Sequence, residues 1–138
     1  MSYSFFGTCS NDHDQLFECL NTILNQSILP KEIILINSGE DEIENYIIQK
    51  LKSKNIKLVY ITKKASRVKS LNLALDQSSS KYSFRFDSRS RFSKFYAENA
   101  LKILEDKYLK VAVAGGVPNI IPEKNNFEAI LCSEIMKR

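Results

Sequence analysis

The sequence has few of the residues that mark disulfide-stabilised, metal-stabilised or dinucleotide-binding proteins. Its 138 residues include no tryptophan, three cysteines, three prolines and four glycines. The cysteines are odd in number, widely spaced and without a CxxC pair, so they indicate neither a disulfide framework nor a zinc site and favour a reducing compartment. No segment matches GxGxxG or GxxxxGK[ST], which removes the main support for dinucleotide oxidoreductases and P-loop NTPases.

Long apolar runs are absent as well. No stretch approaches the ~18 consecutive apolar residues that a transmembrane helix needs, and the N-terminus MSYSFFGTCS lacks the basic start and apolar run of a signal peptide. We therefore expect a cytoplasmic protein with no membrane span in this sequence. Segments outside the sequence could still attach it to the inner face of the membrane.

Positive charge is not concentrated in any one tract. The formal net charge is +4, and the lysines are spread over most of the chain. A nucleic-acid-binding surface usually shows a basic stripe interleaved with aromatic residues. The sequence instead predicts a solvated, lysine-rich surface and no nucleic-acid partner.

Two hydrophobic periods alternate along the chain. Short runs rich in Ile, Val, Phe and Tyr predict strands, and apolar residues three and four positions apart predict the helices between them. The expected strands are Tyr3–Gly7, Glu32–Ile36, Ile56–Ile61, Tyr82–Phe86 and Val111–Ala114. The expected helices run from about Asp12 to Gln26, from about Asp41 to Lys54, through Val68, Leu71 and Leu75, after Ser93, and from about Asn126.

This alternation predicts a single α/β domain over residues 1–138, with a three-layer Rossmann-like fold: a mostly parallel sheet with helices on both faces. A chain with 43% hydrophobic residues can bury the core that such a fold requires. Ligands of these sheets bind beyond the carboxyl ends of the strands, so the residues just after each strand are the candidate site.

Two of these connections carry polar residues suited to a nucleotide. The turn at Asn37, Ser38 and Gly39 could hydrogen-bond a base or ribose, although any strand-to-helix turn uses the same residue types. Lys64, Arg67 and Lys69 gather at a helix N-terminus, where an anion is favoured, or they lie on an exposed helix face. Asn72, between two leucines, is a polar residue that would need a partner if its helix packs tightly.

A third connection, RFDSRSRF, places Asp87 at the end of the fourth expected strand, among three arginines. Strand alternation puts Asp87 on the same side of the sheet as Arg85. A carboxylate there could bind a divalent cation that bridges a diphosphate, since Mg²⁺ and Mn²⁺ prefer carboxylate and phosphate oxygens. Asp87 could equally be held in an ion-pair cluster by Arg85, Arg89 or Arg91.

The order of these segments resembles the donor-binding half of family 2 glycosyltransferases with the GT-A fold, over nearly the whole chain. ECLNTILNQSILPKEIILINSGEDE resembles the family's first helix, NQ turn and second strand. SLNLALDQSSSKYSFRFDS resembles its "ALN…A…GEYI…xD" segment, and AVAGGVPNI resembles its "VGG" strand end. FRFDSRSRFSKFY followed by FEAIL is most similar to the branch that includes succinoglycan-biosynthesis glycosyltransferases.

The resemblance implies which residues contact a nucleotide-diphosphate sugar. It places Thr8, Cys9, Asn11, Asn37 and Ser38 beside the nucleotide base. The resemblance also implies that Asn72 belongs to the helix that faces the donor. Arg67 is added as a donor contact because it lies at a helix N-terminus, where a diphosphate is favoured. Asp87 corresponds to the first acid of the family's DxD metal motif.

The sequence departs from the family pattern at three places. Thr8 and Cys9 stand where the family usually has Pro-Thr, and Asn37 and Ser38 where it usually has two acids. Arg89 stands where a second DxD acid is common, which leaves one carboxylate for a Mg or Mn ion. A guanidinium there could instead neutralise the leaving diphosphate directly, because arginine matches phosphate oxygens bidentately.

Together these features predict a glycosyltransferase for glycan or polysaccharide synthesis, with this chain supplying the donor-binding half. An inverting transfer needs a carboxylate base near the acceptor. We expect the base and acceptor region beyond this sequence, and therefore no full transferase activity from it. The alternatives are a non-catalytic nucleotide-sugar-binding or interaction module, and a sugar nucleotidyltransferase, whose usual glycine-rich basic loop is missing from SFFGTCSND.

Overall fold

Strands and helices alternate along the chain as the sequence predicts. The computed structural model describes residues 2–40, 42–116, 131, 134 and 135. Its elements in chain order are β1 Tyr3–Cys9, α1 His13–Leu24, β2 Glu32–Asn37, α2 Asn45–Ser53, β3 Lys57–Thr62, α3 Arg67–Asp76, β4 Tyr82–Asp87 and α4 Tyr96–Glu105. Residues 1–99 and 100–138 form two compact units, and the sheet with α1, α2 and α3 lies in the first.

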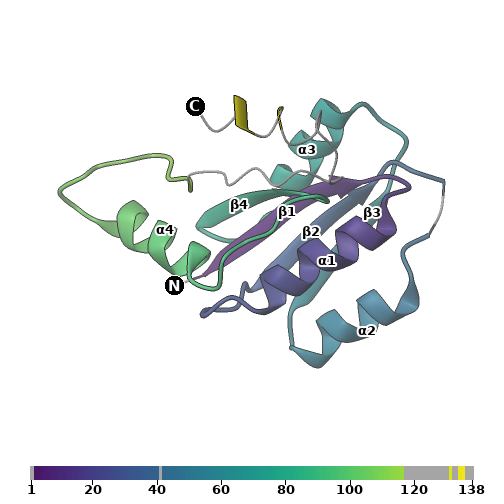
Figure 1. Ribbon diagram of the computed structural model, residues 1–138, viewed down its shortest axis with the longest axis horizontal. Coiled ribbons are helices and arrows are strands. Elements are labelled where there is room, and N and C mark those ends of the chain that lie inside the picture. The colour runs from purple at the N-terminus through teal and green to yellow at the C-terminus, as the bar shows by residue number, and fades with distance from the viewer. Residues whose placement is uncertain (1, 41, 117–130, 132–133, 136–138) are drawn as a thin grey trace. The chain divides into compact units, whose positions relative to one another are not determined.

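The sheet is parallel throughout its four strands, in the order β3-β2-β1-β4 (Figure 1). The register pairs Cys9 of β1 with Asn37 of β2, and Asn37 with Thr62 of β3. On the other side of β1, Thr8 pairs with Asp87 of β4. The carboxyl ends of all four strands therefore meet at one edge, and the connections that follow them begin side by side.

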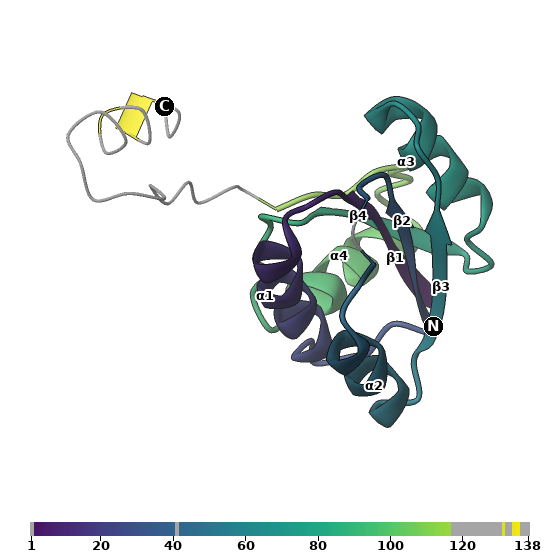
Figure 2. The ribbon, with the colours of Figure 1, turned by 90° about the vertical axis from the view of Figure 1, so that its right-hand side faces the viewer.

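The sheet is covered on both faces within the first unit. Figure 2 shows α1 and α2 on one face and α3 on the other. Leu16, Cys19, Leu20 and Ile23 of α1 are buried. On the α3 face, Ala74 packs with Ile34 and Ile36 of β2. All six residues of β2 are buried, as in central parallel strands that are covered on both sides. The predicted α/β fold is confirmed.

The helix α3 buries a different face from the one that its leucines predict. Ser70 and Ala74 are the buried residues, whereas Val68 is 68% exposed and Leu75 is 48% exposed. Small side chains let the helix lie close over the aliphatic surface of β2, so the expected apolar face of Val68, Leu71 and Leu75 is wrong.

Two other expectations differ from the structure at element ends. The second helix begins at Asn45 rather than near Asp41, so no acid lies in its first turn, although Lys50 and Lys52 do lie in its last turn. Residues 111–116 form no strand, and Val113 is 85% exposed. A strand needs a neighbour for its backbone N–H and C=O groups, and no described strand pairs with this segment.

The last expected helix, from about Asn126, falls mostly outside the described residues. Among the helices that the structure describes, none combines the length and the apolar character that crossing a membrane requires.

Candidate functional site

Backbone contacts tie together the connections at the carboxyl edge of the sheet. The amide and the hydroxyl of Ser38 both donate to the carbonyl of Cys9, at 2.9 and 3.1 Å. The amide of Lys63 donates to the carbonyl of Asn37 at 2.8 Å. The ends of β1, β2 and β3 therefore continue into loops whose first residues are fixed relative to each other.

Gly39 allows the loop after β2 to lie directly against the loop after β1. A Cβ atom at this position would lie 2.3 Å from Oδ1 of Asn11 and 2.9 Å from the carbonyl carbon of Ser10. The second of these atoms is backbone and cannot rotate away. Only glycine fits this approach without moving one of the two loops.

Asn37 shapes the same turn from inside the protein. Its side chain is fully buried, donates through Nδ2 to the Tyr60 hydroxyl at 2.9 Å and accepts through Oδ1 from the Gly39 amide at 2.9 Å. The Tyr60 hydroxyl also accepts from the amide of Ile43 at 3.3 Å. Asn37 therefore has a structural role here, and its predicted contact with a nucleotide stays a prediction.

The loop after β4 is held against the start of α1. The Ser88 hydroxyl donates to the Asp12 carboxylate, and Nη2 of Arg91 donates to Oε1 of Gln15 at 2.8 Å. Asp12 also accepts from the Ser10 amide at 3.0 Å and makes no side-chain cap of α1. Asp12 and Gln15 therefore form no capping pair, because the side chain of Asp12 binds Ser10 and Ser88 and that of Gln15 binds Arg91.

The environment of Asp12 keeps it ionised. Partial burial raises the pKa of its carboxyl, but hydrogen bonds from the Ser88 hydroxyl and from the amides of Ser10 and Asp12, with the positive charge of Arg89, lower the pKa below its ordinary value. Arg89, which is predicted to contact a diphosphate, therefore lies close enough to Asp12 for its positive charge to lower the pKa of that carboxyl.

Asp87 lies in a cluster with two arginines from different elements. Nη2 of Arg67, the first residue of α3, lies 2.5 Å from Oδ1 of Asp87. Nη2 of Arg85 lies 3.2 Å from both carboxylate oxygens. The Ser90 amide donates to the Asp87 carbonyl at 2.8 Å, so Asp87 begins a tight turn. The structure therefore brings together two predicted site residues, Arg67 and Asp87, and adds Arg85.

The donor set at Asp87 does not fit a divalent cation well. No group of three or more His, Cys, Asp or Glu side chains gathers in the described part of the chain. Mg²⁺ and Mn²⁺ are held by several carboxylate or phosphate oxygens. Asp87 offers one carboxylate, and two guanidinium groups already contact its oxygens.

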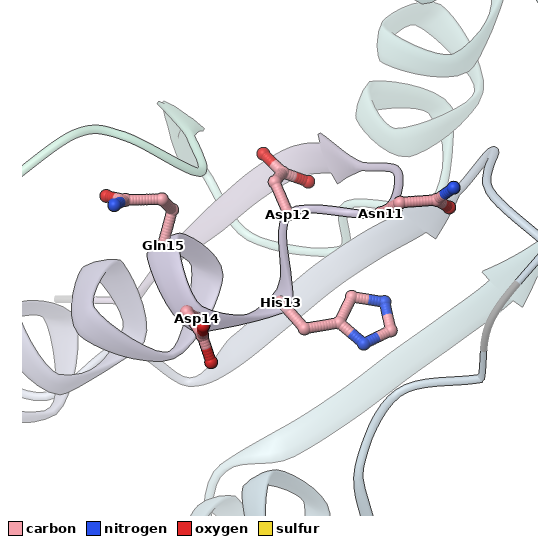
Figure 3. Close-up of a pocket in the computed structure, with 5 residues that line it drawn as sticks. All are labelled: Asn11, Asp12, His13, Asp14 and Gln15. Atoms are coloured by element: carbon pink, nitrogen blue, oxygen red, sulfur yellow. The ribbon is translucent and has the colours of Figure 1, made fainter.

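A pocket of about 300 Å³ opens at the start of α1, beside this edge of the sheet. Its lining consists of Asn11, Asp12, His13, Asp14 and Gln15. Figure 3 shows their side chains projecting from the turn between β1 and α1 and from the first turn of α1, with Asn11 and His13 on the opposite side from Gln15. Nε2 of His13 is buried without a hydrogen-bond partner among the described residues. These polar groups could hydrogen-bond a small polar ligand.

The remaining predicted site residues differ in how accessible they are. Thr8 and Ser38 are half-buried, and Asn11 is exposed. Cys9 is buried, and burial together with the charge of Asp12 raises the pKa of its thiol to about 12, so the thiol is not a reactive group. Asn72 is exposed in α3, so tight packing does not require a partner for it, and no described contact joins it to the Asp87 cluster.

Several site residues were not predicted as ligand contacts, among them Asp12, His13 and Arg85. Alternation along β4 did place Arg85 on the same side as Asp87, so its position was available from the sequence. Asp12 stands at the expected start of a helix, where an aspartate is a common cap, and nothing in the local pattern marked His13. Their roles depend on which loops meet, which the sequence spacing does not specify.

The fold is similar to that of several solved structures, among them a mannosyltransferase. S. aureus TarS is 22% identical with a TM-score of 0.65, and the match covers 90% of this chain and 24% of TarS. S. aureus TarS 1–349 in complex with UDP is 20% identical with a TM-score of 0.66, covering 90% and 40% of the two chains. The mannosyltransferase PcManGT from Pyrobaculum calidifontis, in complex with GDP-Man and Mn²⁺, is 17% identical with a TM-score of 0.60, covering 76% and 32%.

Identities this low establish the fold alone, and the chain spans less than half the length of each of these proteins. No curated protein matches the chain. The sequence family described as "Glycosyl transferase family 2" matches residues 6–132, which is most of the chain and includes β2, β3, β4 and Phe6–Cys9 of β1. This protein chain therefore belongs to glycosyl transferase family 2.

Proposed function

We propose that this chain binds a nucleotide-diphosphate sugar at the carboxyl ends of β1, β2, β3 and β4. The observation that supports this most is the cluster of Arg67, Arg85 and Asp87, which sets exposed positive charge at the edge where parallel sheets bind ligands. Membership of family 2 supports a sugar donor, and TarS and PcManGT were solved with UDP and with GDP-Man.

The two ends of the donor are proposed to lie at different parts of this edge. The nucleotide lies beside the turn that follows β1 and the loop after β2, near Thr8, Cys9, Asn11, Asn37 and Ser38. Since the side chains of Cys9 and Asn37 are buried, they act through the shape and the backbone of these loops. The diphosphate and sugar lie toward Arg67, Asn72, Asp87 and Arg89.

The proposed reaction is transfer of the sugar to a glycan or polysaccharide acceptor. This chain supplies the donor-binding half, and the catalytic base is not assigned to any of its residues. The similarity of FRFDSRSRFSKFY to the succinoglycan-type branch supports a polysaccharide acceptor and a cytoplasmic site of synthesis. This part of the proposal depends on the sequence resemblance.

A divalent cation at Asp87 is one way in which such a site could hold the diphosphate. The PcManGT complex contains Mn²⁺ together with GDP-Man, which supports a cation in proteins of this fold. The second way is direct contact with arginine side chains. The single carboxylate also suits a module that binds the donor without turnover, which is the alternative function.

A thermal-shift screen with UDP, GDP, CDP and dTDP, each with and without Mn²⁺, tests the proposal. A ligand at about 100 times its Kd stabilises the folded state by about 2.7 kcal/mol, so we expect one or two of these diphosphates to raise the Tm by several degrees. The matching nucleosides should give a smaller shift. If none of the four diphosphates changes the Tm under any condition, the proposed donor site is wrong.

A further inference from the structure

The ion pairs of Asp87 are too exposed to contribute much to the stability of the fold. The side chains are 63% exposed for Arg67, 50% for Arg85 and 42% for Asp87. Ion pairs at such positions contribute about 0–1 kcal/mol to folding, because water and salt screen them and ordering the side chains costs entropy. Both arginines are nevertheless held at one point of the strand edge, which indicates a use other than stabilising the fold.

The cluster has an excess of positive charge. Two guanidinium groups share one carboxylate, so the three side chains together carry a net charge of +1. Lys63, exposed directly after β3, adds positive charge to the connection that leads into Arg67, whereas the charge of Lys64 is offset by Glu40, 3.7 Å away. An anion that approaches this edge therefore meets a local positive charge without any bound ion.

A divalent cation at the same carboxylate would face two obstacles. Arg67 and Arg85 already contact the oxygens that it would need, and their positive charges would repel it at short range. The position two residues beyond Asp87, where a second acid would help, is Arg89. In the described residues no other acidic, His or Cys group completes a metal site.

Arginine has the geometry that a diphosphate requires. Its planar guanidinium carries five N–H donors, and two parallel donors can bind two phosphate oxygens at once. Both guanidinium groups contact Asp87 through Nη2, and the two arginine side chains are at least half exposed, so a ligand can reach them. Asp87 then serves to orient them toward the same point.

We propose that Arg67 and Arg85, oriented by Asp87, bind the diphosphate of the nucleotide sugar directly, so that donor binding does not require a divalent cation. This inference rests on the proposed function, because it names the groups that recognise the ligand of that site. Arg67 and Arg85 are binding residues, and Asp87 is a positioning residue.

Isothermal titration of the full chain tests the inference, with whichever of UDP, GDP, CDP and dTDP the thermal screen shows to bind. Each titration is run in Mn²⁺ and in EDTA. We expect the Kd of the wild-type protein to be the same within about threefold in the two buffers. Arg67→Gln and Arg85→Gln should each weaken binding roughly 10- to 100-fold, the usual range for a lost hydrogen bond to a charged group.

Three further variants separate the possible causes of weaker binding. Arg67→Lys keeps the charge but not the planar fork and should fall between wild type and Arg67→Gln. Asp87→Asn should weaken binding less than either arginine change, because it removes only the orienting group. Lys52→Gln, which removes one exposed positive charge from the last turn of α2, should leave the Kd unchanged.

The outcomes distinguish this inference from the proposed function. Diphosphate binding that appears only with Mn²⁺ and is abolished by Asp87→Asn would overturn the arginine site while leaving the donor site intact. Unchanged affinity in both Arg67→Gln and Arg85→Gln would overturn it as well. If no diphosphate binds the wild type in either buffer, the proposed function fails and the inference fails with it.

Discussion

Single polar side chains at the carboxyl edge of the sheet have two separate tasks. Asn37 and Tyr60 are joined by a hydrogen bond and hold the turn after β2 from inside. Arg67 and Asp87 are exposed and paired at the surface, where a ligand can reach them. In the sequence, all four residues simply carry polar groups near the ends of strands. Only their burial in the structure separates the side chains that shape a loop from those that can bind a ligand.

Gly39 offers the clearest test at the residue scale. Gly39→Ala would set a Cβ atom 2.9 Å from the carbonyl carbon of Ser10, so one of the two loops must move. We expect the free energy of unfolding to fall by about 1–3 kcal/mol, as for other overpacked sites. Urea unfolding followed by circular dichroism measures this change.

Gly115→Ala is the matched control, because among the described residues no atom beyond its chain neighbours lies within 4 Å of a Cβ built at Gly115. This variant should change the free energy of unfolding by less than about 0.5 kcal/mol. Equal stabilities of the two alanine variants would contradict the close approach of the loops after β1 and β2.

Connections between elements at the amino edge of the sheet are fixed by a buried acid. Glu32, the first residue of β2, is fully buried and accepts from the Ser4 hydroxyl at 2.8 Å and from the Ser79 amide at 2.7 Å. Lys57 at the start of β3 lies 3.7 Å from its other oxygen. Glu32 thereby joins β1, β2, β3 and the connection from α3 to β4.

This arrangement predicts a pH dependence of stability. Burial raises the pKa of Glu32, but hydrogen bonds from the Ser79 amide and from the Ser4 and Ser79 hydroxyls, with the charge of Lys57, lower it below its ordinary value. A lowered pKa in the folded state means that the stabilisation is present above the usual glutamate pKa of about 4.3 and is lost as the pH falls through the lower folded-state pKa.

Urea unfolding of the wild type and Glu32→Gln between pH 3 and pH 7 checks this sign. The variant should be less stable at pH 7 by about 1–3 kcal/mol, because a buried acceptor is replaced by a group that also donates. The difference should shrink below about pH 4. A difference that is the same at every pH would show that the charge of Glu32 does not stabilise the fold.

The element scale also shows why the face of α3 could not be predicted. Hydrophobic spacing identified a helix, and the helix forms, but Ser70 and Ala74 rather than Val68 and Leu75 face the sheet. The fully buried Ile34 and Ile36 of β2 already supply the apolar surface there, so small residues on the helix allow the closest packing. Hydrophobic periodicity alone does not show whether the sheet surface that faces a helix packs best against small or large side chains.

For the whole molecule, the order of elements was predictable and the contacts between loops were not. Alternating strands and helices indicated a parallel sheet, and therefore a ligand edge that includes Asp87. The helix α3 connects β3 to β4, and these two strands are separated in the sheet by β2 and β1. The chain therefore crosses the sheet through α3, and Arg67 of this helix pairs with Asp87 of β4. That neighbourhood arises from the strand order, which local sequence patterns do not encode.

The central claim is that a nucleoside diphosphate binds where the four strands end. Backbone amide NMR shifts of the full chain, recorded while the best diphosphate of the thermal screen is added, test this claim most directly. We expect the largest shifts at residues 8–12, 37–39, 62–67 and 87–91, with little change near Glu32 and Ser79 at the opposite edge. Largest shifts at that opposite edge, or no shifts at saturating ligand, would contradict the account.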